Sequence, residues 1–186
     1  ESLISLSLLQ KDNERLREIL SLKETSDNYS ISAAVISRKT GSWWRQIILN
    51  KGSKDGVDVG STVVGPGGLL GRVTSTSFFT SSVTLLTSPE SKLGVWVDRT
   101  QINGLLVGSG TDNPSLIFYS KEADVKVGDF VSSSPASTLL PPNIPIGIIQ
   151  SLDEPFKAKK IAKILLLAKP NVIDWVQILK VKKYNE

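Results

Sequence analysis

A seven-residue pattern that occurs twice constrains this chain more than any other feature. Residues 57–63 (VDVGSTV) and 125–131 (VKVGDFV) both read V-x-V-G-x-x-V. Alternating valines favour an extended chain with one buried face, and the glycine permits a bend that a side chain would obstruct. A second glycine follows each copy, so we predict two related β-units; coincidence within a valine-rich β protein is the alternative. The predicted structural corners are Gly60, Gly71, Gly128 and Gly147.

Short apolar stretches separated by glycine, proline and serine run through most of the chain. Many short strands with breaks at intervals of about 8–12 residues are typical of a mainly β barrel or sandwich. Because a closed barrel leaves no strand edge exposed, we expect two small six-stranded barrels. The expected strands are residues 31–37, 43–50, 63–64, 69–75, 82–86, 93–98, 102–107, 115–119, 130–132, 146–152, 161–167 and 176–181.

The strand count predicts an interleaved division of the chain. Residues 39–112 contain six expected strands and residues 113–183 contain five, so the strand at residues 31–37 would complete the second set. Residues 39–112 would form an inserted barrel, and residues 30–38 together with 113–183 would form the second. Pairing of residues 31–37 only with strands of residues 39–112 would refute this division.

Residues 1–24 are expected to form a coiled-coil helix that dimerises. Four leucines and one asparagine recur at spacings of three and four, which makes a narrow seam along one face of a helix. An asparagine in such a seam pairs best with another asparagine and favours two helices in register. The alternative is an amphipathic helix packed against its own domain. The expected dimerisation residues are Leu6, Leu9, Asn13, Leu16 and Leu20.

The composition limits the chemistry that this chain can perform. It contains no histidine and no cysteine, so it lacks the base of a Ser-His-Asp triad, a cysteine nucleophile and the commonest metal ligands. The S-x-x-K pattern is absent as well. Asp124 and Asp129 flank the second corner, but capping of the turn explains two carboxylates better than a cation site does. We therefore expect no enzyme activity, no cofactor and no metal site.

Three further features have simpler interpretations than a ligand site. The glycine-rich residues 65–72 lack the Lys-Ser/Thr ending of a phosphate loop and lead into a strand, so we interpret them as a turn. The net charge of +4 comes mostly from lysines near the C-terminal end. Without interleaved aromatic residues these lysines favour solvated strand faces over nucleic-acid binding. Of the adjacent Trp43 and Trp44, one should point outward, either to anchor a partner or to pack on the neighbouring barrel.

Several short segments match a known family in order and spacing: residues 13–17, 20–22, 34–38, 49–57, 67–73, 80–87, 127–131 and 144–147. Over nearly its whole length, the chain resembles the bacterial rod shape-determining MreC family. It departs from the family pattern at residues 133–135 (SSP), where Ser-Gly is usual, and at residues 142–144 (PNI), where Pro-x-Gly-Ile is common.

The resemblance implies a membrane-anchored, non-catalytic scaffold on the periplasmic side of the bacterial inner membrane. Such a scaffold serves the cell-elongation machinery that synthesises peptidoglycan and determines rod shape. The implied fold is a coiled-coil dimer with two barrels related to the halves of chymotrypsin-like proteases, the second copy interleaved. Implied partners are a second copy in a dimer or filament, a class B penicillin-binding protein that it would bind and regulate, MreD and MreB, but no nucleic acid. The membrane helix would precede Glu1. A trypsin-like-fold hydrolase and a cell-wall-binding module are the alternatives.

Overall fold

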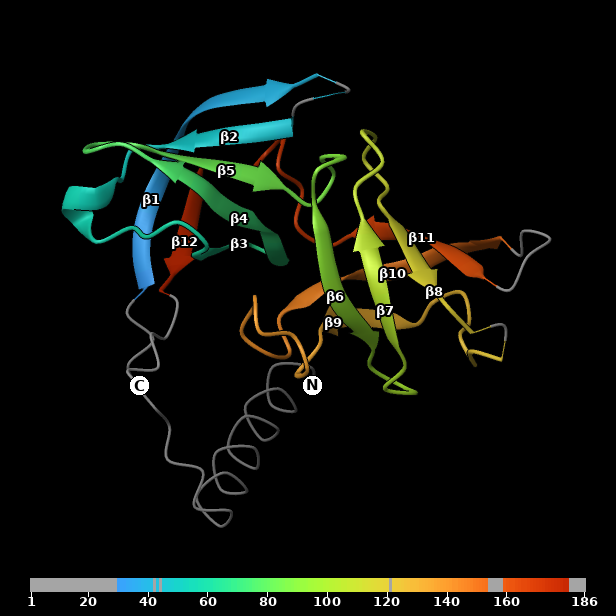
Figure 1. The fold of residues 1–186 in the computed structure, drawn as a ribbon. Coiled ribbons are helices and arrows are strands. Elements are labelled where there is room, and N and C mark those ends of the chain that lie inside the picture. The colour runs from blue at the N-terminus through green and yellow to red at the C-terminus, as the bar shows by residue number, and fades with distance from the viewer. Residues whose placement is uncertain (1–29, 42, 44, 121, 154–158, 181–186) are drawn as a thin grey trace, which may run out of the picture.

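A computed structural model of the protein describes residues 30–41, 43, 45–120, 122–153 and 159–180. Within them, twelve strands form two closed six-stranded barrels (Figure 1), and each strand overlaps one of those expected. Barrel A contains β1 (Ser30–Thr40), β2 (Arg45–Leu49), β3 (Thr62–Gly65), β4 (Gly68–Thr76), β5 (Ser81–Leu85) and β12 (Trp175–Leu179). Barrel B contains β6 (Lys92–Val97), β7 (Asn103–Val107), β8 (Ser115–Phe118), β9 (Phe130–Ser133), β10 (Pro145–Asp153) and β11 (Lys160–Leu166). A short 3-10 helix, η1 (Ser53–Asp55), precedes β3.

The expected division into residues 39–112 and residues 30–38 plus 113–183 is wrong, although one barrel is inserted into the other. β1 pairs with β12 on one side and with β2 on the other, so barrel A is begun by residues 30–85 and closed by the last strand. Barrel B is the insert. Both divisions contain six strands per barrel, and apolar alternation fixes only which face of a strand is buried. The sequence pattern therefore could not distinguish them.

The two barrels repeat the same strand pairing, which confirms the predicted duplication. Around barrel B the neighbouring strands are β6-β9-β10-β11-β8-β7, and around barrel A they are β12-β3-β4-β5-β2-β1. The two orders are the same when β12 is matched with β6 and β1 to β5 are matched with β7 to β11. In barrel A, Val63 at the end of the repeated pattern pairs with Gly71. In barrel B, Val131 pairs with Gly147 in the same way. Relative to barrel B, barrel A is thus circularly permuted, with its equivalent of β6 moved to the end of the chain.

The corners at Gly60 and Gly128 have the same geometry. Their φ angles are 91° and 93°, in the left-handed region that favours glycine. The N–H of Gly60 donates to the carbonyl of Val73 on β4, and that of Gly128 to the carbonyl of Ile149 on β10, both at 2.8 Å. Each corner is therefore fastened to the long strand that crosses its barrel.

The valines before each corner do not share a buried face as expected. Val57 and Val125 are buried, whereas Val59 and Val127 are 60% and 62% exposed. The chain already turns before the glycine, so these residues are not in an extended strand. The alternating valines of the repeated pattern therefore mark a turn and not the buried face of a strand.

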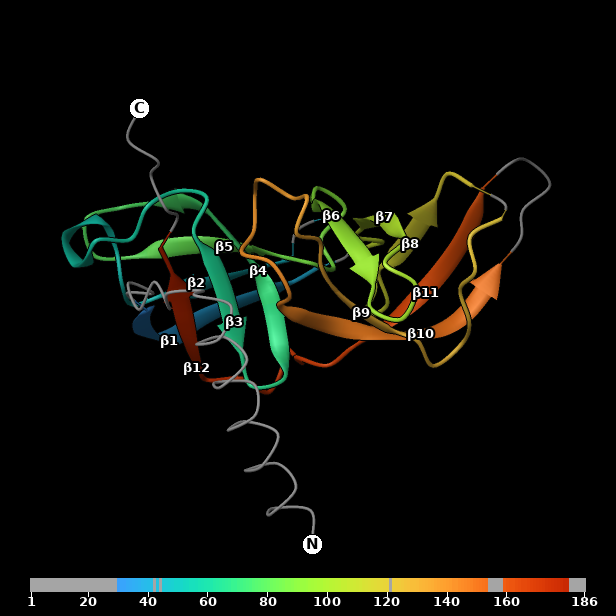
Figure 2. The ribbon, with the colours of Figure 1, turned by 90° about the horizontal axis from the view of Figure 1, so that it is seen from below.

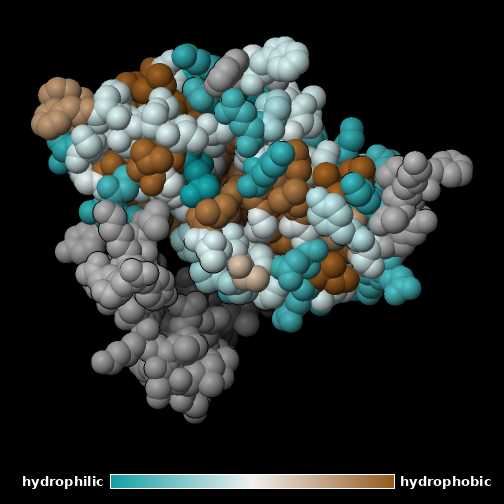
Figure 3. Space-filling view, in the orientation of Figure 1, coloured by the Kyte–Doolittle hydropathy of each residue, from teal (hydrophilic) through white to brown (hydrophobic). Residues whose placement is uncertain are grey.

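The glycine-rich turn between β3 and β4 is where the two barrels meet. A Cβ on Gly67 would lie 2.5 Å from the carbonyl oxygen of Leu167, and one on Gly68 would overlap the backbone of Pro145. The next residue, Leu69, belongs to the core cluster of barrel B although it lies on a strand of barrel A. In Figure 3 hydrophobic side chains gather at the junction of the two barrels. The turn interpretation is confirmed, and the glycines allow close approach of two backbones.

The predicted coiled-coil helix and its dimerisation residues, Leu6, Leu9, Asn13, Leu16 and Leu20, lie outside the described residues. No helix in the described part of the chain has the length and apolar character needed to cross a bilayer.

Candidate binding surfaces

The acidic residues at the second corner bind an arginine. Arg99 lies between the carboxylates of Asp129 and Asp124, with Nη2–Oδ2 and Nη1–Oδ2 distances of 2.9 and 3.0 Å. Asp129 also accepts a bond from the backbone N–H of Lys126 at 2.9 Å, which confirms the capping interpretation. Hydrogen bonds from Arg99 lower the pKa of both aspartates. Among the described residues, no cluster of three acidic side chains could hold a metal ion.

The loop between β9 and β10 shows how this chain accommodates its departures from the family pattern. Within residues 133–135, the hydroxyl of Ser133 donates to the carbonyl of Pro141 at 2.6 Å and accepts from the N–H of Ile144 at 2.8 Å. Asn143, within residues 142–144, has a φ of 60°. Asparagine tolerates this left-handed conformation better than most residues. The loop is therefore held by its own hydrogen bonds.

The lysines near the C-terminal end do not gather into one surface within the described residues. The Nζ of Lys160 donates to the carbonyl of Ala123, and that of Lys159 lies 5.4 Å from the ring centre of Tyr119, both on barrel B. Lys169 lies on the segment between the barrels, and Lys180 follows the last strand of barrel A.

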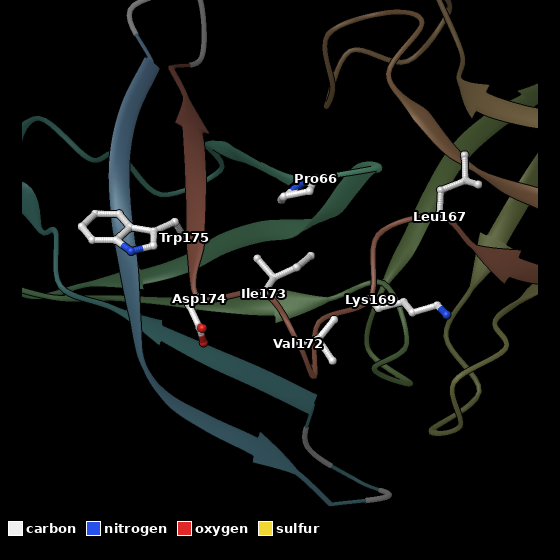
Figure 4. A pocket seen from close by; sticks show the side chains of 7 residues that line it. All are labelled: Pro66, Leu167, Lys169, Val172, Ile173, Asp174 and Trp175. Carbon is white, nitrogen blue, oxygen red and sulfur yellow. The ribbon is translucent and has the colours of Figure 1, made fainter.

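A shallow hollow of about 350 Å³ lies on the segment that joins β11 to β12 (Figure 4). Arg38 of β1 fastens this segment, because its guanidinium donates to the carbonyls of Pro170 and Ile173 and forms an ion pair with Asp174 at 2.8 Å. Trp175, which follows directly, is 63% exposed. The hollow is lined by Pro66, Leu167, Lys169, Val172, Ile173, Asp174 and Trp175.

The hollow lies beside the outer side of barrel A, part of which is covered by barrel B. Figure 2 looks onto β12, β3 and β4, which are neighbours in the barrel. We call their outer side the β12–β3–β4 face. Its exposed or half-exposed residues are Trp175, Gln177, Leu179, Arg72 and Thr74. On β3, Thr62 is buried and Val64 packs against the core cluster of barrel B.

Two other exposed aromatic groups lie at turns. Trp43 between β1 and β2 is 79% exposed, as predicted for one of the two adjacent tryptophans, while Trp44 lies outside the described residues. Phe78 and Phe79 pack edge to face with ring centres 4.8 Å apart at the turn between β4 and β5. Lys54 of η1 lies over the Phe79 ring. Figure 1 places this turn and η1 at the end of barrel A far from barrel B.

Sequence reasoning selected neither Trp175, Arg38 nor Arg72 as a site residue. Arg38 and Arg72 lie in two of the matched segments, residues 34–38 and 67–73, which was the only signal for them. Which strand Trp175 joins could not be known before the barrel closure was known.

Comparison with known proteins identifies the architecture. Residues 35–180 match the family model described as "Rod shape-determining protein MreC, barrel core". The chain is 31% identical to the cell shape-determining protein MreC of Caulobacter vibrioides over 179 residues, which cover 96% of this chain and 50% of the relative. For MreC of Haemophilus influenzae the identity is 32%, covering 81% of this chain and 43% of the relative. The chain thus spans about half the length of these relatives.

Solved structures agree with the sequence relatives. MreC of Listeria monocytogenes superimposes with a TM-score of 0.81 at 29% identity, covering 95% of this chain and 88% of that one. MreC of Pseudomonas aeruginosa gives a TM-score of 0.76 at 25% identity, covering 81% of this chain and 99% of that one. Two closed six-stranded barrels, the matched barrel core and the relatives lead to one conclusion: the chain belongs to the MreC family of rod shape-determining proteins.

Proposed function

We propose that this chain is a non-catalytic periplasmic scaffold of the cell-elongation machinery that binds and regulates a class B penicillin-binding protein. The observation that carries the proposal is the family match over residues 35–180. A solved complex joins the penicillin-binding protein PBP2 to MreC of Helicobacter pylori, whose MreC has the same fold at a TM-score of 0.67 and 15% identity. Another relative was solved as the "major periplasmic domain" of MreC, which supports the periplasmic side of the inner membrane.

The architecture suits a scaffold because it presents fixed surfaces. Barrel B is tied to barrel A at both of its ends, and the Arg45–Asp112 ion pair at 2.7 Å also joins them. The backbones touch at Gly67 and Gly68. A partner that binds either barrel therefore meets the other in a set orientation.

Dimerisation through residues 1–24 belongs to the same proposal, and so do contacts with MreD, with MreB and with further copies in a filament. The support is the seam spacing. A paired stalk would place two copies of each barrel surface at high local concentration, which strengthens weak partner sites without new contacts.

We assign the partner-docking surface to the β12–β3–β4 face with its hollow. An exposed tryptophan beside an apolar depression is the kind of residue that dominates binding energy in protein interfaces. The segment beneath it is fastened by Arg38, so little ordering entropy is lost on binding.

The test measures binding of the chain to the periplasmic part of the elongation class B penicillin-binding protein from the same bacterium by biolayer interferometry. Trp175→Ala should weaken binding by about tenfold or more, since hot-spot truncations cost at least ~2 kcal/mol. Trp43→Ala is the matched control and should bind like the parent. Equal binding by both variants would reject the docking surface, and absence of binding by the parent chain would reject the proposed function.

A further inference from the structure

One arginine of barrel A lacks the partner that the other described arginines have. Arg38, Arg45 and Arg99 each bond an aspartate, at 2.8, 2.7 and 2.9 Å. Arg72 has no carboxylate partner among the described residues: its Nη2 donates to the carbonyl of Gly60 at 3.4 Å, and its buried Nε has no partner. Burial lowers the pKa of Arg72, because it removes water from the charged guanidinium.

The strands on either side of Arg72 carry no other charge. Strands β3, β4 and β5 carry no ionisable side chain except Arg72. Its cross-strand neighbours are the nearly buried Thr62 on β3 and Thr84 on β5. The uncharged loop of residues 134–144 lies beside β4 (Figure 2). A half-buried guanidinium in a neutral field is costly unless something pairs with it.

Building on the proposed function, we infer that Arg72 is the anchor for a carboxylate side chain, Asp or Glu, of the protein that docks on the β12–β3–β4 face. The planar guanidinium offers two parallel N–H donors to a carboxylate. Thr74 is exposed on the same strand, and its hydroxyl lies 3.2 Å from that of Thr84, which gives the carboxylate a polar border.

A protein carboxylate fits this site better than a polyanionic surface does. Polyphosphates and anionic polymers are bound by clusters of cations that contact several negative groups. Arg72 is a single cation in an uncharged row. Protein interfaces have this composition at their centres, where charged residues are depleted and arginine is enriched. Arg72 also lies on the face that carries Trp175, so one partner can contact both.

The test uses the 186-residue chain and the periplasmic part of the class B penicillin-binding protein. Arg72→Gln removes the charge, Arg72→Lys keeps the charge without the fork, and Lys92→Gln removes an exposed charge on barrel B as a matched control. Thermal melting confirms that all variants fold. We expect about tenfold weaker binding for R72Q, a smaller loss for R72K and no change for K92Q.

The partner carboxylate is then located by Asp→Asn and Glu→Gln substitutions in the penicillin-binding protein. One of them should weaken binding of the parent chain about tenfold and leave binding of R72Q unchanged. Binding of R72Q equal to that of K92Q would overturn this inference and leave the proposed function standing. Absence of binding by the parent chain would overturn both. Loss of binding by R72Q with no coupled carboxylate, but with competition by soluble peptidoglycan fragments, would assign Arg72 to a polymer and overturn the protein carboxylate.

Discussion

Replacing Gly67 by alanine tests whether close backbone contact at the β3–β4 turn holds the barrels together. The added Cβ would lie 2.5 Å from the carbonyl oxygen of Leu167, and the φ of Gly67 is 100°. An L residue in left-handed backbone costs about 1–2 kcal/mol. The Leu167 backbone must also retreat, and such overpacking costs about 1–3 kcal/mol. The free energy of unfolding should therefore fall by about 2–5 kcal/mol, the sum of these two ranges.

Gly128→Ala is the matched control, because its φ is 93° but its Cβ would meet nothing within 4 Å. It should lose only the backbone part, about 1–2 kcal/mol. At about 2–4 °C per kcal/mol for a domain of this size, G67A should melt about 4–20 °C below the parent, and G128A about 2–8 °C below it. Differential scanning calorimetry at neutral pH measures both. Equal losses for the two variants would refute the reasoning, since the clash is the only difference between the sites.

Two further predictions concern other parts of the chain. Because Arg99 lowers the pKa of Asp124 and Asp129 below the ordinary value of 3.8, it contributes stability that is present above that pH and is lost as pH falls through the lower folded values. Arg99→Gln should therefore be destabilised at neutral pH and lose less stability than the parent on acidification below about pH 4, as measured by urea unfolding; parallel curves would contradict this. Replacing Leu9 and Leu16 by aspartate should leave the barrels folded by circular dichroism and lower the mass found by sedimentation equilibrium, and an unchanged dimer mass would count against the seam.

The strands and the duplication could be predicted because they depend on local patterns. The pairing of Val63 with Gly71 and of Val131 with Gly147 follows from the same residue types at the same spacing in both copies. The domain division could not be predicted, since whether β1 and β12 close a barrel with β2 to β5 or with the later strands depends on tertiary packing between segments far apart in the chain.

The docking surface was missed for a related reason. Trp175 lies one residue before the expected strand at residues 176–181, and only the barrel closure places it outward opposite Ala34 of β1. Arg38 and Arg72 are both arginines in strands of barrel A, yet one meets Asp174 from a distant segment and the other meets no carboxylate among the described residues. Such differences are decided by contacts between segments that no local pattern encodes.

The circular permutation gives the interleaving a mechanical consequence. In barrel B the first strand, β6, directly precedes β7. If the equivalent strand of barrel A preceded β1 in the same way, the two barrels would follow each other on the chain with one connection between them. Instead the chain passes from barrel A to barrel B after β5 and returns before β12, so two connections cross the junction. The second of them carries the hollow and is fastened by Arg38. A partner seated on the hollow therefore contacts the strand whose removal would open barrel A, which couples partner binding to the stability of that barrel.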